Sequence, residues 1–294
     1  MPTFIFMGPK FLIITPARDE EANIAETIAN MASQTLRPAR WIIVDDGSSD
    51  GTLEILTQAA AEHDWIECVS NEDRGFRAAG SGVVEAFYKG FDLVEDLEFD
   101  YIVKFDADLS FGRDYLERCH AKFELQPKLG IGGGMIYNMI NGVRTLEEHP
   151  AFHVRGATKI YRRACWEDIG GLFKVPGWDT LDEVKAQMTG WETESFPDIA
   201  IDQLRMTGGA AGQWANWKKN GRASYIAGYD PFYLTARAIK KVVRSAELVA
   251  GFGLITGYLT AMAKRIPQVD DPELLAFLKK NQRNRLIGKS TIWR

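Results

Sequence analysis

Strand-like and helix-like segments alternate through the first 110 residues, and this pattern restricts the possible folds more than any other feature of the chain. Four short segments are apolar, as in buried strands, and the segments between them carry apolar residues at helical spacing. Such an order predicts an α/β fold, doubly wound, with a mostly parallel sheet. Ligands of these sheets bind at the carboxyl ends of the strands. The expected strands are Phe11–Thr15, Trp41–Val44, Ile66–Val69 and Tyr101–Phe105, and the expected helices are Glu20–Gln34, Leu53–Ala61 and Ser81–Phe91.

The pattern loosens after Phe111, where glycines interrupt shorter elements, and the composition changes again near residue 228. We therefore expect an α/β domain over residues 1–227 and a helical, basic extension over residues 228–294. Within the extension, Leu248–Ala263 holds 16 residues without a charge, flanked on both sides by basic residues. Three interpretations stay open: a buried helix pair, an in-plane or re-entrant membrane contact, and a membrane span, which needs about 20 apolar residues.

Composition excludes several classes of protein. A hydrophobic share of 46% and a charged share of 26% are typical of a folded chain and not of a disordered one. Cys68, Cys119 and Cys165 are isolated, so we expect neither a disulfide framework nor a cysteine-based metal site, and they indicate a reducing compartment. No secretory leader is expected at the N-terminus, which favours a cytoplasmic location.

Charge is distributed unevenly along the chain. The first 231 residues hold 23 basic and 36 acidic side chains, whereas the stretch from Phe232 to the end holds 12 basic and 4 acidic ones. An acidic body argues against a nucleic-acid partner. The basic tail suits an anionic surface, either lipid or another partner, and residues 232–266 are the expected contact with the inner face of the plasma membrane.

Polar clusters follow each of the four expected strands. Two adjacent acids, Asp45 and Asp46, open a Gly- and Ser-rich turn in which Ser49 or Asp50 can cap the next helix. Beyond that structural role, the acidic pair can accept hydrogen bonds from a base or from ribose hydroxyls. Asp106 and Asp108 end the fourth strand, and two carboxylates at this spacing can face one cleft and hold Mg²⁺ or Mn²⁺ together with substrate phosphates.

The other two strands end in clusters of different chemistry. The segment Thr15–Glu21 combines Pro16, an arginine and three acids, and its alternative role is a loop with acids at the positive end of a helix. Arg74 and Arg77 follow the third strand and suit either a basic surface loop or phosphate contact. The joint placement of the four clusters is more specific than any single one.

In this order, PARDEE, VDDGSSDGT, an Arg/Gly/Ala segment and FDADLS resemble the motifs of the family 2 glycosyltransferases, which have the GT-A fold. The resemblance covers about residues 11–190 and continues loosely through GYDPFYLTAR, as in bacterial polysaccharide-type members. It implies transfer of a sugar from a UDP- or GDP-sugar with inversion of the anomeric centre. It also implies that Asp108 holds the divalent cation, together with Asp106, which faces the ribose or diphosphate. The nucleotide-binding residues it implies are Pro16, Arg18, Asp19, Glu20, Asp45, Asp46, Arg74, Arg77, Asp106 and Arg205.

An inverting transfer needs a base, which in the family is usually the Asp of a Glu-Asp pair about a dozen residues before a Gly. Asp179 lies eleven residues before Gly190 and is the first candidate, with Asp182 second. Trp178 stands where the Glu of the pair is expected. Thr180 and Glu183 also fit a capping box, which would leave Asp179 in a loop just ahead of the helix.

A second departure from the family pattern lies near the expected diphosphate site. Gln203 stands where a His is expected, and Arg205 remains able to neutralise diphosphate charge. His149 and His153 are isolated and are not predicted to be functional. The resemblance implies a UDP-sugar donor, with a GDP-sugar as second choice, and a saccharide or lipid-linked acceptor.

The sequence also bears on two other function classes. A nucleotide-sugar-binding protein of the same fold that has lost turnover is the alternative, because of the departures at Trp178 and Gln203. A dinucleotide-binding oxidoreductase is disfavoured, because no GxGxxG follows the first strand.

Overall fold

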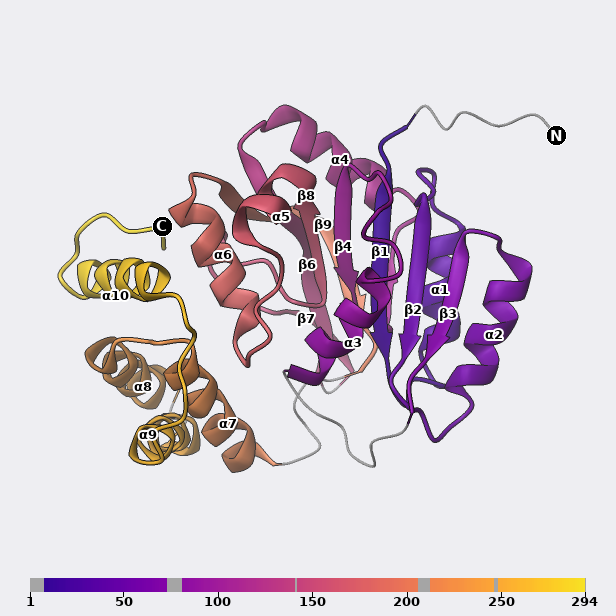
Figure 1. Cartoon of the computed structure of the whole chain (residues 1–294). Helices are drawn as coiled ribbons and strands as arrows, with labels where there is room; N and C mark the ends of the chain where they lie inside the picture. Colours follow the sequence, from indigo (N-terminus) through magenta and orange to yellow (C-terminus); the bar gives the residue numbers. More distant parts are fainter. Residues whose placement is uncertain (1–7, 73–80, 141, 206–211, 246–247, 294) are drawn as a thin grey trace.

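A computed structural model describes residues 8–72, 81–140, 142–205, 212–245 and 248–293 (Figure 1). Within them a nine-stranded sheet has the order β3-β2-β1-β4-β8-β6-β9-β5, and β7 pairs with β6. The strands are β1 Phe11–Ala17, β2 Arg40–Asp45, β3 Ile66–Ser70, β4 Tyr101–Phe105, β5 Leu109–Phe111, β6 Leu129–Ile140, β7 Val143–Leu146, β8 Thr158–Arg162 and β9 Glu192–Gln203. The helices are α1 Ile24–Ala32, α2 Thr52–Glu62, α3 Ser81–Phe91, α4 Tyr115–Leu125, α5 Arg163–Ile169, α6 Trp178–Met188, α7 Gln213–Ile226, α8 Pro231–Ser245, α9 Leu248–Ala263 and α10 Pro272–Leu286.

The pairing pattern confirms the predicted α/β class with a mostly parallel sheet. β2 and β4 both pair with β1 in parallel, and β3 pairs with β2 in parallel. β8 is antiparallel to β4, and β6 is antiparallel to β8, so β6 runs in the direction of β4 again. β9 follows β6 in parallel. The four predicted strands are therefore neighbours whose carboxyl ends meet at one edge.

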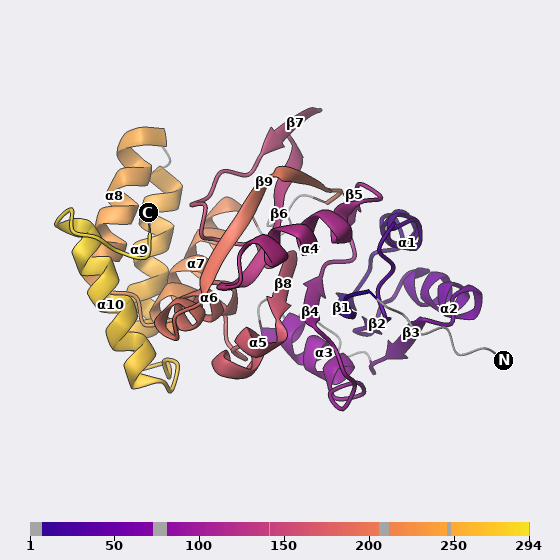
Figure 2. The ribbon, with the colours of Figure 1, turned by 90° about the horizontal axis from the view of Figure 1, so that it is seen from above.

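Helices cover both faces of the sheet. On one face α1, α2 and α4 pack on the strands, and on the other α3 and α5 do so (Figure 2). Strands buried on both faces need continuous apolar sequences, which explains why Phe11–Ile14 and Trp41–Val44 contain no polar residue. β1 and β2 therefore each contribute side chains to two hydrophobic clusters, one on each face of the sheet. The polar residues gather where these strands end.

A third apolar cluster joins α6 to the C-terminal helices, with Leu181 and Val184 of α6 packed among residues of α8, α9 and α10. α7 and α9 approach closely because both carry glycines: a Cβ at Gly257 would lie 2.0 Å from the carbonyl oxygen of Lys218. α7 ends before the domain boundary that the sequence predicts at residues 227–228. That boundary stays a prediction. Among the described residues, no helix combines the length and apolarity that crossing a bilayer requires.

Candidate functional site

The loops that follow β1 and β2 are tied together by hydrogen bonds between backbone and side chains. The N–H of Asp19 donates to Ser48 Oγ at 3.0 Å, and the N–H of Ser49 donates back to Asp19 Oδ1 at 2.8 Å. The N–H of Glu20 donates to Thr52 Oγ1 at 2.8 Å. Asp19 has a φ of +53°, a left-handed conformation that these bonds hold in place. The two acidic motifs thus form one rigid rim at the carboxyl edge of the sheet.

The paired acids after β2 divide their roles. Asp45 is buried and accepts the N–H of Ser48 in its own turn. The expected helix cap at Ser49 or Asp50 is wrong, because Gly51 is the N-cap of α2. Asp46 is half-buried and accepts from Asn71 Nδ2 at 3.2 Å, while its carbonyl oxygen accepts from the guanidinium of Arg18 at 2.8 Å. Pro16 lies in β1 beside β2. Asp46 and Arg18 therefore lie side by side where the resemblance implies the nucleotide's base and ribose.

Asp106 and Asp108 lie on the bend between β4 and β5, and α1 fixes the backbone of that bend. The hydroxyl of Thr27 lies 3.0 Å from the carbonyl oxygen of Ala107 and 2.9 Å from that of Leu109, and it accepts the N–H of Leu109 at 3.0 Å. Thr27 is fully buried, so these bonds form without competition from water. The positions of both carboxylates are thereby set by helix packing.

Residues from three segments surround Asp108. Gln203, at the end of β9, donates to Asp108 Oδ2 at 3.3 Å, and Arg205 Nε lies 3.9 Å from the same oxygen. Arg205 also forms an ion pair with the buried Glu20. Burial, together with the negative charges of Asp106 and Glu20, raises the pKa of Asp108 to about 7. Negative charge is thus in excess at this point, and it would be relieved by a cation.

The donor set at this bend fits a divalent cation that shares its ligands with phosphate. Lys104 pairs with Asp106 Oδ1, and Asp108 uses Oδ2 for Gln203 and Arg205. Within the described residues the other oxygen of each carboxylate has no hydrogen bond or ion pair. These residues contain no group of three or more His, Cys, Asp or Glu that could hold a metal alone. Two carboxylate oxygens suit Mg²⁺ or Mn²⁺, which completes its coordination with phosphate and water.

The second part of the site is the first turn of α6. The helix begins at Trp178 after Gly177, whose φ is +88°, so the predicted capping box at Thr180 is wrong. Asp179 lies inside the first turn and not in the loop ahead of it. Glu183 does not reach back to the helix start, because its carboxylate accepts the N–H of Val154 at 2.7 Å.

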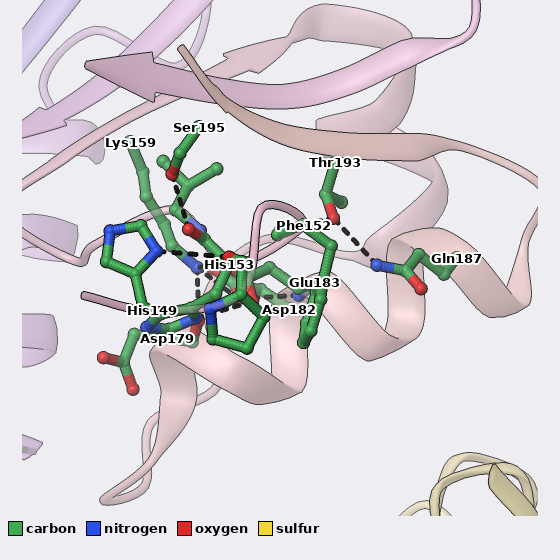
Figure 3. Close-up of polar contacts among 12 residues, drawn as sticks. His149, Phe152, His153, Lys159, Asp179, Asp182, Glu183, Gln187, Thr193 and Ser195 are labelled. Carbon is green, nitrogen blue, oxygen red and sulfur yellow. Dashed lines mark hydrogen bonds and ion pairs between the residues drawn. The ribbon is translucent and has the colours of Figure 1, made fainter. Parts of the chain in front are cut away.

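A buried charge cluster supports this turn (Figure 3). Lys159 of β8 is fully buried; its Nζ lies 2.7 Å from Asp182 Oδ1 and 2.9 Å from Glu183 Oε1, and it donates to the main-chain oxygen of Asp179. His153 Nδ1 lies 2.9 Å from Glu183 Oε2. Figure 3 shows the carboxylate of Asp179 at the outside of this cluster, with no dashed line to it.

The charges of this cluster shift the pKa values of Asp179 and His153 in opposite directions. Burial would raise the pKa of Asp179, but the positive charges of His153, Lys159 and Arg155 outweigh it and hold that pKa below its usual value. Burial alone would lower the pKa of His153, but the negative charge of Glu183 has the larger effect, so that pKa is raised. The charges of the cluster therefore favour the ionised form of Asp179 and the protonated form of His153.

Asp182, the second candidate base, is enclosed. It is fully buried, accepts from Tyr161 OH at 2.5 Å and is bound to Lys159. Burial raises the pKa of Asp182 to about 6. Both of its oxygens are used inside the protein, so it has none to offer an acceptor.

Trp178 connects the two parts of the site. Lys104 and Lys159 are opposite each other in the β4–β8 register, and their Nζ atoms lie 5.8 and 5.6 Å from the centre of the Trp178 ring. The residue that departs from the Glu-Asp pair is thus a buried ring in contact with two lysine cations. Through these lysines, Asp106 and the backbone of Asp179 belong to one continuous network.

Three residues of the site were not predicted from the sequence, and two predicted ones cannot be placed. Arg74 and Arg77 lie outside the described residues. Sequence reasoning missed Lys104, Lys159 and His153. The signal for Lys104 was a charge within an otherwise apolar strand, which requires a buried partner. Lys159 lies in a strand that also carries Thr158 and Arg162, so it had no such signal.

Comparison with known proteins gives the same assignment from several directions. The family model for glycosyl transferase family 2 matches residues 12–174, more than half of the chain. The poly-β-1,6-N-acetyl-D-glucosamine synthase of Staphylococcus aureus strain COL is 29% identical over 113 residues, which are 38% of this chain and 25% of that protein. A Bacillus subtilis strain 168 protein named as the glycosyltransferase EpsE is 32% identical over 145 residues, 47% of each chain. The chain thus matches less than half of the length of these relatives.

Solved structures share the fold. The Pyrobaculum calidifontis mannosyltransferase PcManGT, in complex with GDP-Man and Mn²⁺, superposes with a TM-score of 0.55 at 19% identity, over 95% of this chain and 83% of that one. S. aureus TarS superposes with a TM-score of 0.53 at 17% identity, over 86% of this chain and 43% of that one. TarS 1–349 has also been solved with UDP and with UDP-GlcNAc.

Proposed function

Because the chain belongs to glycosyltransferase family 2 and has the GT-A fold, we propose that it transfers a sugar from a nucleoside-diphosphate sugar to a hydroxyl of a saccharide or lipid-linked acceptor, with inversion of the anomeric centre. The observation that carries this is the network that joins Asp106 to the backbone of Asp179 through Lys104, Trp178 and Lys159. We assign residues 1–227 to donor binding and catalysis and residues 228–294 to a helical extension.

The donor we propose is a UDP-sugar. TarS binds UDP and UDP-GlcNAc, and the staphylococcal relatives are named as synthases of a polymer of N-acetylglucosamine. PcManGT binds GDP-Man with Mn²⁺, so a GDP-sugar is the second choice. The same relatives favour a saccharide acceptor and a role in polysaccharide synthesis.

Asp106 and Asp108 would hold a divalent cation, Mn²⁺ or Mg²⁺, on the donor diphosphate. When bound, the cation neutralises charge that builds up on the departing nucleoside diphosphate. Arg205 binds the same phosphates from the other side and keeps Glu20 neutralised through its ion pair. Asp46 and Arg18 orient the nucleotide's base and ribose at the rim.

Asp179 accepts the proton of the acceptor hydroxyl. As the acceptor oxygen forms its bond to the anomeric carbon, the bond from that carbon to the diphosphate oxygen breaks on the opposite face, which inverts the centre. The lowered pKa of Asp179 keeps it ionised before the reaction, and Lys159 and Glu183 fix the helix turn that carries it. Proton acceptance belongs to Asp179 and not to Asp182, because both oxygens of Asp182 are bound in the interior.

Calorimetric titration tests the metal assignment. Wild-type protein is titrated with UDP, GDP and the matching nucleotide sugars, with Mn²⁺ and with EDTA. We expect Asp108→Asn to lose the Mn²⁺-dependent part of the affinity, and the control Asp198→Asn, a half-exposed acid paired with Lys122, to keep it. Equal wild-type affinity with Mn²⁺ and with EDTA would contradict the metal proposal.

The base assignment is tested by Asp179→Asn, which keeps the side-chain shape and removes the basic oxygen. Donor affinity stays near wild type, and the transfer rate falls by about 10²–10⁴-fold, the usual contribution of a general base. The anomeric configuration of the product, read by NMR, tests inversion. Unchanged transfer by Asp179→Asn would refute the assignment, and donor binding without transfer to any acceptor would favour the binding-protein alternative.

A further inference from the structure

Two C-terminal helices carry an apolar stripe on their solvent side. On α9, Leu248, Phe252, Leu259 and Met262 are exposed and fall on one side of the helix; Phe252 keeps 62% of its surface. The opposite side, with Gly253 and Gly257, packs on α7. The uncharged segment therefore contributes both to the helix packing and to an apolar outer face.

α8 adds a second stripe. Phe232, Ile239 and Val243 are spaced at seven and four residues, and Phe232 and Val243 keep 74% and 76% of their surface. Leu234 and Ala238 are buried on the inner side of the same helix. An amphipathic helix in a folded protein turns its apolar side inward, so a helix with apolar residues on both sides needs something to cover the outer one.

The stripes on α8 and α9 form one surface. A Cβ at Gly251, near the start of α9, would lie 2.5 Å from Val242 in the second half of α8. Tyr258 OH, further along α9, donates to the carbonyl of Tyr229 just before α8, so the two helices run antiparallel. Viewed from its own N-terminus, each helix has its exposed stripe displaced in the same rotational direction from the side that contacts the other helix. Because the two helices are antiparallel, both stripes therefore face the same side. Figures 1 and 2 show the two helices side by side at the end of the molecule remote from α2.

Exposed basic side chains accompany the stripes along the sequence of both helices. Arg237 and Lys240 of α8 and Lys264 and Arg265 after α9 are exposed, and Asp270 is the nearest exposed acid that follows in the described residues. The rest of the chain is acidic, so the positive rim is a local feature. A large apolar area with a positive rim is complementary to the headgroup region of an anionic bilayer.

We propose that the α8–α9 surface, made of Phe232, Ile239, Val243, Leu248, Phe252, Leu259 and Met262 with its basic rim, docks on an anionic membrane. The apolar side chains enter the headgroup–acyl boundary while the rim binds lipid phosphates. In Figure 1 helices α8 and α9 lie at the lower left, and β1 is entered from above, so the carboxyl ends of the parallel strands point downward. This inference does not depend on the proposed transfer reaction.

Co-sedimentation with vesicles tests it without any donor sugar. Vesicles of phosphatidylcholine with and without phosphatidylglycerol are compared at low and high NaCl. We expect binding that requires phosphatidylglycerol and weakens with salt. Ile239→Ser with Phe252→Ser lowers the partition coefficient at least about tenfold, because two apolar side chains no longer leave water. Lys240→Gln, Lys264→Gln and Arg265→Gln each lower the partition coefficient by about fivefold.

Matched controls lie at the end of α4. Leu125, which keeps 80% of its surface, and Lys128 are exposed in the same way but belong to no stripe, so Leu125→Ser and Lys128→Gln leave binding unchanged. Protein that stays in the supernatant at low salt with phosphatidylglycerol overturns the proposal. Light scattering identifies the rival occupant: a dimer that Phe252→Ser converts to a monomer, with vesicle binding unaffected, assigns the surface to a second copy and also overturns it.

Discussion

Replacement of Lys159 by Met tests whether the buried charge cluster is organised as described. Lys159 is fully buried and touches two fully buried carboxylates, Asp182 at 2.7 Å and Glu183 at 2.9 Å. Met has a similar length and no charge, so Lys159→Met removes the cation with little change in volume. Removing one partner of a buried ion pair costs about 3–5 kcal/mol, because the other charge stays buried without compensation.

The assay is urea unfolding followed by circular dichroism at pH 8. With an m-value of about 3 kcal/mol per molar urea, a loss of about 3–5 kcal/mol moves the midpoint down by about 1–1.7 M. The control is Arg163→Met: Arg163 Nε lies 2.8 Å from Glu167, but the two side chains are 44% and 59% exposed, and such pairs contribute at most about 1 kcal/mol. A second substitution, Asp182→Asn, restores part of the loss by removing one orphaned charge.

The pH dependence of the loss has a definite sign. Without Lys159 the pKa of Asp182 rises above its wild-type value of about 6, so the folded variant binds a proton that the unfolded chain releases. A raised carboxylate pKa makes stability increase as pH falls, by about 1.4 kcal/mol per unit for one group. The deficit of Lys159→Met is therefore largest at pH 8 and narrows toward pH 6. A loss of stability as small as that of Arg163→Met, or a loss that stays constant between pH 8 and pH 6, would refute this account of the charge cluster.

Other substitutions probe the remaining supports of the site. Asp108→Asn stabilises the metal-free protein at pH 8 by up to about 4 kcal/mol, since the pKa of Asp108 is raised to about 7 and the ionised form is the costly one; urea unfolding in EDTA shows this gain shrinking toward pH 5. Thr27→Val leaves the buried N–H of Leu109 unpaired and costs about 1–3 kcal/mol, with weaker nucleotide binding by calorimetry. Gly257→Ala lowers the melting temperature, because its Cβ would lie 2.0 Å from the backbone of Lys218; an unchanged temperature would contradict the close α7–α9 packing.

Local pattern was sufficient for the half of the sheet that carries the nucleotide-type loops. The predicted strands and helices through Phe105 all form, because each is specified by apolar residues within its own segment. Their parallel order then brings the carboxyl ends together, so the acids after β1, β2 and β4 could be placed at one edge before any contact was known.

The start of α6 could not be placed in this way, because two local signals compete there. Thr180 and Glu183 have the spacing of a capping box, whereas Gly177 supplies the left-handed conformation from which the helix begins. Tertiary contacts decide between them: the carboxylate of Glu183 is taken by Val154, His153 and Lys159, all distant in sequence. The same contacts make His153 part of the site although nothing near it in the sequence marks it.

The strand register explains why the two lysines remained hidden until the fold was known. β8 pairs antiparallel with β4, and this sets Lys159 directly opposite Lys104 on one face of the sheet. Like charges in that position repel each other, so the pair is stable only if each lysine has its own counter-ion. Lys104 pairs with Asp106, two residues further on and just past the end of β4. The counter-ions of Lys159 are Asp182 and Glu183, in the first turns of α6. The requirement for neutrality across one strand pair thus fixes where α6 must pack, and with it where Asp179 lies relative to Asp106.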